Sequence, residues 1–232
     1  MINFASRRLF FWGKKAAPEL ISKEAELKVM QYRGKLDFFL ENVKQFEEAE
    51  PLRTGVIEGQ CTAEGTARLK QRAVAANIPA KNFRKTYELA AGEQLDLSTV
   101  GLGTYLGAPN DEDDFDTYIA AKYLLNSGSV NVIDTAANYR CQKAERTIGQ
   151  ALKYAEVERD EIFVSTKAGY IPDDADNGIP AASLIQDLKD QELITDEDVA
   201  GGIHCMHPNF LAHQLDASKK NLGLGTIDLV YL

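Results

Sequence analysis

The chain has few cysteines and no long apolar run. Its three cysteines, Cys61, Cys141 and Cys205, are far apart, form no C-x-x-C pair and are odd in number. This usage predicts free thiols in a reducing compartment and excludes a disulfide framework. No apolar run reaches the roughly 18–20 residues that a bilayer span requires, so the sequence predicts no transmembrane helix.

Basic residues are also in deficit. The 26 lysines and arginines are outnumbered by 35 aspartates and glutamates, which gives a net charge of -9. A chain this acidic repels nucleic-acid phosphates, so it is a poor candidate for coating nucleic acid, and no nucleic-acid partner is predicted. Its 232 residues, 44% of them hydrophobic, are enough for one sizeable core with a smaller appendage.

The first 17 residues contain no acidic residue. Two basic pairs flank a short apolar stretch, Leu9 to Trp12, and these pairs are Arg7, Arg8, Lys14 and Lys15. A basic, amphipathic N-terminus predicts a mitochondrial targeting segment. The alternatives are a disordered tail and a strip that docks on a partner or a membrane surface.

Residues 18–50 predict an amphipathic helix, because apolar side chains recur at alternating spacings of three and four. They are Val29, Tyr32, Leu36, Phe39, Val43 and Phe46. Only about three heptads are sustained, so the helix is expected either to pack on another helix or chain or to cover its own domain. Residues 51–94 predict an irregular arm that holds one short helix at 63–76, capped by Thr62.

The main domain, residues 95–232, alternates strands with helices. Strands are expected at 95–105, 131–135, 161–166 and 226–232, and helices at 118–126, 143–155 and 208–222. This alternation predicts an α/β fold with a mostly parallel sheet, either doubly wound or a (β/α)8 barrel. Gly101, Gly103 and Gly107 form G-x-G-x-x-x-G, one residue too long for a dinucleotide fingerprint, so the barrel is favoured.

Two clusters suggest metal sites, but each has a simpler explanation. The acidic run at 111–116 suits the N-terminal end of a helix, where it offsets the helix dipole. His204, Cys205 and His207 lack a further ligand nearby except His213. No metal site is therefore predicted.

Three polar residues follow strands where barrel chemistry takes place. Asp134 ends the second strand, Tyr139 lies in the loop after it, and Lys167 follows the third strand. A tyrosine has a pKa of about 10, and a neighbouring ammonium stabilises its phenolate, so the pair suits proton donation to a carbonyl. Asp134 would orient the lysine, Tyr139 would be the general acid and Lys167 the activating cation. Turn capping, packing and solvation are the ordinary alternatives for each residue alone.

Several motifs resemble the aldo-keto reductase family over residues 95–232. These motifs are VGLGTYLG at 100–107, NVIDTAANYR at 131–140, AERTIGQAL at 144–152, RDEIFVSTKAGY at 159–170 and the stretch at 205–232 that begins CMHPNFL. The resemblance implies a TIM-type barrel that reduces aldehydes and ketones with NADPH and without metal. It places Asp134, Tyr139 and Lys167 in the catalytic tetrad, and Thr104, Tyr105 and Asp134 beside the nicotinamide. The substrate cannot be read from the sequence.

The sequence also departs from the family pattern. The fourth tetrad member, a histidine, follows a Tyr-Leu pair in the family, and here Tyr231-Leu232 ends the sequence. Strands five to eight, which hold most of the cofactor in the family, lie outside it, and Ala144 stands where serine is usual. We therefore expect half of a (β/α)8 barrel, four βα units preceded by a helical N-terminal arm, with a partner protein over its open edge.

Two functions remain open at this stage. The first is an accessory subunit of a mitochondrial assembly that lacks catalysis on its own. The second is an NADPH-dependent aldehyde or ketone reductase that becomes active when the missing half complements it. The long loop at 169–202, with a helix expected at 182–193, would shape substrate entry in one case or dock on a partner in the other.

Overall fold

The computed structural model of the protein describes residues 51–86 and 92–232. The predicted targeting segment at 1–17 and the amphipathic helix at 18–50 lie outside the described residues. Among the helices that are described, none is both long and apolar enough to cross a bilayer.

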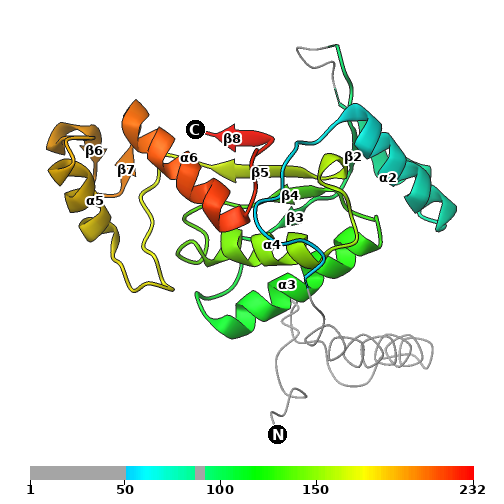
Figure 1. The fold of residues 1–232 in the computed structure, drawn as a ribbon, viewed down its shortest axis with the longest axis horizontal. Coiled ribbons are helices and arrows are strands. Elements are labelled where there is room, and N and C mark those ends of the chain that lie inside the picture. The colour runs from blue at the N-terminus through cyan, green and yellow to red at the C-terminus, as the bar shows by residue number, and fades with distance from the viewer. Residues whose placement is uncertain (1–50, 87–91) are drawn as a thin grey trace, which may run out of the picture. The chain divides into compact units, whose positions relative to one another are not determined.

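A four-stranded parallel sheet forms the centre of the fold. Its strands lie side by side in chain order: β3 (Leu102–Gly103), β4 (Val132–Asp134), β5 (Phe163–Lys167) and β8 (Leu229–Tyr231). The crossover helices α3 (Asp111–Asn126), α4 (Lys143–Tyr154) and α6 (Pro208–Leu222) join one strand to the next (Figure 1). This α/β arrangement confirms the predicted fold class and is consistent with a partial (β/α)8 barrel.

The two faces of the sheet differ in burial. Ile133 of β4 and Val164 of β5 are fully buried in the main core, together with Ile148 of α4 and Leu222 of α6. Side chains one position along each strand lie on the opposite face. On that face Asp134, Lys167 and Tyr231 are partly or largely exposed. The helices therefore cover one face, and the polar strand ends emerge on the other.

The predicted strand at 95–105 is wrong in extent, because the structure divides it between two sheets. β2 (Asp96–Ser98) pairs antiparallel with β1 (Phe83–Lys85), whereas β3 joins the central sheet. The Ser98 hydroxyl donates to the carbonyl of Val100, and the Asn131 side chain accepts from the Ser98 N–H at 2.7 Å. These bonds hold the backbone in a bend where a continuous strand would have run straight.

Helix α2 (Ala63–Ala75) confirms the short helix predicted in the arm. Thr62 is its cap, and its hydroxyl accepts from the Gly65 N–H at 2.9 Å. The helix packs beside a 3-10 turn at Arg159–Glu161, and its Arg72 forms two hydrogen bonds with the fully buried carboxylate of Glu161. A second 3-10 turn, Ala80–Asn82, leads into β1.

The acidic run is the first turn of α3, which begins earlier than predicted. Asn110 caps the helix by accepting from the Asp113 N–H at 2.8 Å. Four acidic residues, 111–114, then lie at the positive end of the helix dipole, where negative charge is stabilising. The sequence pattern of apolar residues in 118–126 marked only the buried half of this helix.

The segment between β5 and α6 is a small unit with its own core. It contains α5 (Ala181–Asp190), a 3-10 turn (Asp196–Asp198) and an antiparallel pair, β6 (Val199–Ala200) and β7 (His204–Cys205). These two strands were not predicted, and α5 ends three residues before the expected limit. The buried core of this small unit consists of Ile171, Leu188, Ile194, Cys205 and Phe210.

Candidate active site

The ends of β4 and β5 bring Asp134 and Lys167 together. Both strands are parallel and adjacent, so their carboxyl ends meet at one edge of the sheet. The Lys167 Nζ lies 2.9 Å from each carboxylate oxygen of Asp134 and 3.0 Å from the carbonyl oxygen of Thr135. Ser165 donates a further hydrogen bond to Asp134 Oδ1 at 3.0 Å, so the carboxylate is held from two sides.

Tyr139 lies beside this ion pair. The Lys167 Nζ is 4.7 Å from the centre of the Tyr139 ring, and the Tyr105 ring meets the same ring edge-on at 5.1 Å. Burial lowers the pKa of Lys167, but interactions with Asp134 and Tyr139 outweigh it and leave the pKa raised. The lysine is therefore held as a cation, and all three residues predicted for catalysis lie at one place.

The residues predicted to face a nicotinamide differ in accessibility. Thr104 is buried, its hydroxyl donates to Thr135 Oγ1 at 2.8 Å, and its N–H donates to the carbonyl of Asp134 at 3.1 Å. Tyr105 is 67% exposed, and the Asp134 side chain is 43% exposed. Tyr105 and Asp134 thus present an exposed ring and a carboxylate next to Tyr139, whereas Thr104 is bonded beneath them.

The turn after Tyr139 is conformationally strained, which the sequence did not reveal. Arg140, Cys141 and Gln142 have φ angles of 48°, 54° and 72°, so three successive residues other than glycine adopt the left-handed region. Such a conformation costs roughly 1–2 kcal/mol per residue and persists only where surrounding contacts enforce it. The turn directly follows Tyr139 in the loop after β4 and leads into the first residue of α4.

An ion-pair network enforces this turn. The side chain of Arg140 is almost fully buried and pairs with Asp114 of α3 at 2.7 Å. Lys143, at the start of α4, pairs with Asp111, Asp114 and Asp176 at 3.1, 2.9 and 2.6 Å. The hydrogen bond to Asp176 is the largest of several that raise the pKa of Lys143. Part of the acidic run thus holds basic residues of the turn, a role that sequence spacing could not indicate.

The histidine and cysteine cluster has structural partners. His204 and Cys205 form β7, and His207 caps α6 by accepting from the Asn209 N–H at Nδ1. Within residues 51–86 and 92–232, no group of three or more His, Cys, Asp or Glu side chains could hold a metal ion.

A parallel βα sheet with polar residues at the carboxyl ends of its strands is an α/β fold, consistent with part of a (β/α)8 barrel. A sequence profile of the aldo/keto reductase family matches residues 99–232, more than half of the chain. The chain therefore belongs to the aldo-keto reductase family, as its motifs suggested.

The chain aligns with only part of the length of each similar protein. Over 137 residues the chain is 29% identical to the NADH-specific methylglyoxal reductase of Escherichia coli (strain K12), which covers 57% of this chain and 37% of that protein. Over 90 residues it is 38% identical to the glycerol 2-dehydrogenase (NADP(+)) of Saccharomyces cerevisiae (strain ATCC 204508 / S288c), with 39% and 26% covered. The chain thus spans little more than a third of the length of the methylglyoxal reductase.

Solved structures of the family resemble it as well. An aldo-keto reductase from Bacillus halodurans is 21% identical, with a TM-score of 0.41 over 64% of this chain and 39% of that one. A glycerol dehydrogenase from Gluconobacter oxydans is 22% identical, with a TM-score of 0.40 over 66% of this chain and 39% of that one.

Proposed function

We propose that this chain carries the acid-donating part of a carbonyl reductase that uses NADPH. The observation that supports the proposal most strongly is the Lys167 ammonium, which is held by both carboxylate oxygens of Asp134 and lies against the Tyr139 ring. Family membership adds that relatives are named as a methylglyoxal reductase and a glycerol dehydrogenase. The remaining strands of a full barrel would come from residues outside these 232.

Each residue of the site has a separate role in reducing a carbonyl. The nicotinamide, when bound, supplies the hydride. Tyr139 donates its phenolic proton to the substrate oxygen, and Lys167 stabilises the phenolate that this leaves behind. Asp134 keeps Lys167 charged and in position, and the exposed ring of Tyr105 would lie against the cofactor.

The test is a kinetic comparison in the native species purified from its source. NADPH and NADH oxidation would be followed with methylglyoxal and other small aldehydes. Tyr139→Phe removes the proton, so we expect the rate to fall by about 10²–10⁴-fold with little change in KM. Tyr170→Phe, a partly exposed tyrosine outside the trio, is the matched control and should keep its rate. Turnover that survives Tyr139→Phe would show that Tyr139 is not the acid.

A second proposal is supported by the uncovered face of the sheet. Leu229, Tyr231 and Leu232 at β8 are 36%, 52% and 76% exposed, although they are large and apolar. In this proposal the chain is an accessory subunit of a mitochondrial assembly, brought there by its basic first 17 residues, and a protein partner covers this face. A native species that has no turnover and migrates as a stable complex would favour this role. A stable, active monomer would exclude it.

A further inference from the structure

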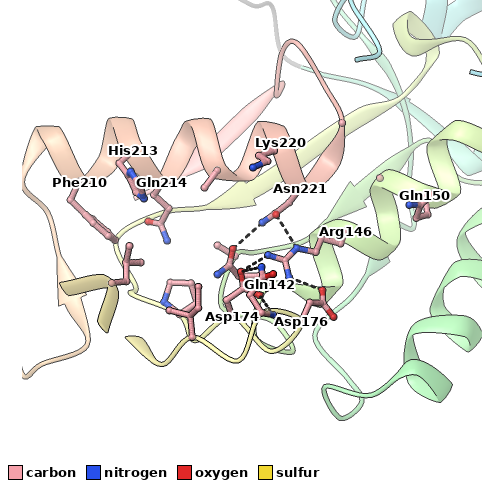
Figure 2. Close-up of a pocket in the computed structure, with 18 of the residues that line it drawn as sticks. Gln142, Arg146, Gln150, Asp174, Asp176, Phe210, His213, Gln214, Lys220 and Asn221 are labelled. Carbon is pink, nitrogen blue, oxygen red and sulfur yellow. Dashed lines mark hydrogen bonds and ion pairs between the residues drawn. The ribbon is translucent and has the colours of Figure 1, made fainter. Parts of the chain in front are cut away.

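A cavity of about 590 Å³ lies away from the candidate active site, between α4, α6 and the loop after β5. None of Asp134, Tyr139 and Lys167 lines it. Figure 2 shows side chains from both helices and from the loop converging on this space. Its volume falls within the range of roughly 300–1,000 Å³ that small-molecule sites occupy.

The cavity has two chemically different ends. Phe210 and His213 lie in the first half of α6 and Lys220 near its end, as Figure 2 shows. Ten residues of helix separate Phe210 from Lys220, which is about 15 Å at 1.5 Å per residue. Phe210 and Leu184 belong to the same apolar core at this end, where His213 and Gln214 also line the cavity.

The other end is basic. Lys153, in the last turn of α4, and Lys220 both line the cavity. The Cε of Lys153 would lie 3.6 Å from a Cβ at Gly223, so the two helix ends meet here. Neither lysine side chain forms an ion pair or hydrogen bond with any residue that the structure describes. Both ammonium groups therefore line the cavity without a partner among the described residues.

The wall between the two ends carries an ion-pair network centred on Arg146. Arg146 makes paired hydrogen bonds to Asp174, both at 2.7 Å, and a further bond of 2.6 Å to Asp176. Its Nε donates to Asn221 Oδ1 at 3.1 Å, and these contacts appear as dashed lines in Figure 2. The hydrogen bond with Arg146 is the main cause that holds the pKa of Asp174 well below its usual value. Arg146 is therefore fully engaged by Asp174 and Asp176, so Lys153 and Lys220 are the lining cations that remain for a ligand.

We propose that this cavity binds an elongated organic anion. Its apolar body lies toward Phe210 and Leu184, and its acidic head group, a carboxylate or a phosphate, lies between Lys153 and Lys220. The alternative role for the lysines is to offset the helix dipoles at the ends of α4 and α6, which would stabilise the helices without any ligand.

The experiment titrates the 232-residue chain with decanoate and with monodecyl phosphate by calorimetry, and decanol is the uncharged control. We expect one or both anions to bind at one site and decanol to bind at least tenfold more weakly. The Lys153→Met, Lys220→Met double variant should weaken the anion about tenfold, because two partly exposed charge contacts are lost. Lys219→Met is the matched control, since Lys219 is the adjacent residue of α6 and does not line the cavity. The relative affinities of the two anions identify the head group.

Two further results locate the site. Ala217→Trp would fill the middle of the cavity without changing charge and should abolish binding. Amide NMR shifts on adding decanoate should appear at Gln142 and Ala217. The proposal is overturned if neither anion binds, if the lysine variant binds as well as Lys219→Met, or if the shifts are confined to Leu229 and Tyr231 on the exposed sheet face.

Discussion

Glu145 is a fully buried carboxyl group whose bonded partners are all uncharged. Its side chain accepts from the Thr166 hydroxyl at 2.6 Å and from the Asn221 amide at 3.0 Å, and Ser218 contributes as well. Burial raises the pKa of Glu145, and these hydrogen bonds oppose the rise only in part. Because the pKa is higher in the folded state than in the unfolded chain, the contribution of Glu145 to stability is complete below its unfolded pKa. That contribution is lost as the pH rises through the pKa that Glu145 has in the folded state.

Glu145→Gln is therefore expected to change the pH dependence of stability. The Gln amide can donate to the Thr166 hydroxyl and accept from Asn221, so both hydrogen bonds survive without a buried charge. The free energy of unfolding of the variant, relative to the natural protein, should increase as the pH rises above 4.5, the ordinary pKa of a glutamate. Urea unfolding at several pH values would measure it, with Glu93→Gln at an exposed position as the control. A parallel pH dependence in the natural protein and the Glu145→Gln variant would refute the raised pKa.

The candidate site shows which residues a sequence can reveal. Asp134 and Lys167 were predictable because the carboxyl ends of adjacent parallel strands must meet. The pairing of Lys143 with Asp176 was not, because no periodicity relates a helix start to a loop 33 residues later. The left-handed turn at Arg140 was equally hidden, since it contains no glycine to mark it.

At the scale of the elements, α4 and the end of α6 approach each other closely at Gly149. A Cβ added there would lie 2.5 Å from the carbonyl oxygen of Asn221 and 2.9 Å from the carbonyl carbon of Leu222. These are backbone atoms at the end of α6 and cannot move aside as a flexible side chain would. The glycine is therefore retained inside a helix because of packing, although it lowers helix propensity.

Gly149→Ala tests this close approach. Helix propensity alone would make alanine about 1 kcal/mol more stable, whereas overpacking against backbone costs roughly 1–3 kcal/mol or more. We expect a net loss of about 2 kcal/mol in the free energy of unfolding, measured by urea denaturation. Gln150→Ala, the next residue and an exposed one, should be neutral or slightly stabilising. A stabilised Gly149→Ala protein would mean that the helices are not in contact here.

Element boundaries were predicted well where local signals mark them. The helix at 208–222 has Pro208 at its start and Gly223, with φ +64°, at its end, and the structure gives the same limits. The stretch at 95–105 has apolar content typical of a strand, but tertiary hydrogen bonds from Asn131 divide it. β6 and β7 are only two residues each, too short for any alternation to appear in the sequence.

In the part of the molecule that is described, the hydrophobic residues form two separate cores. The larger joins the central sheet to its helices and includes Ile133 and Val164, and the smaller is centred on Leu188 in the segment between β5 and α6. Two backbone hydrogen bonds of 2.8 Å, from Ile171 to Ile203 and from Cys205 to Gly169, join the two ends of the smaller unit to each other. The ion pairs of Arg146 with the loop at 174–176 fasten it from the side.

The smaller unit should therefore open at a lower free energy than the central sheet. Native-state hydrogen exchange would show weaker protection for the Leu188 amide than for Ile133 and Val164, with a smaller dependence on denaturant. Removing the side attachment with Arg146→Met should lower protection at Leu188 further and leave Ile133 unchanged, because that residue belongs to the other core. Arg84→Met, on the short strand β1, is a control that should alter neither. Equal opening free energies at Leu188 and Ile133, in both the natural protein and Arg146→Met, would instead mean that the two cores unfold as one cooperative unit.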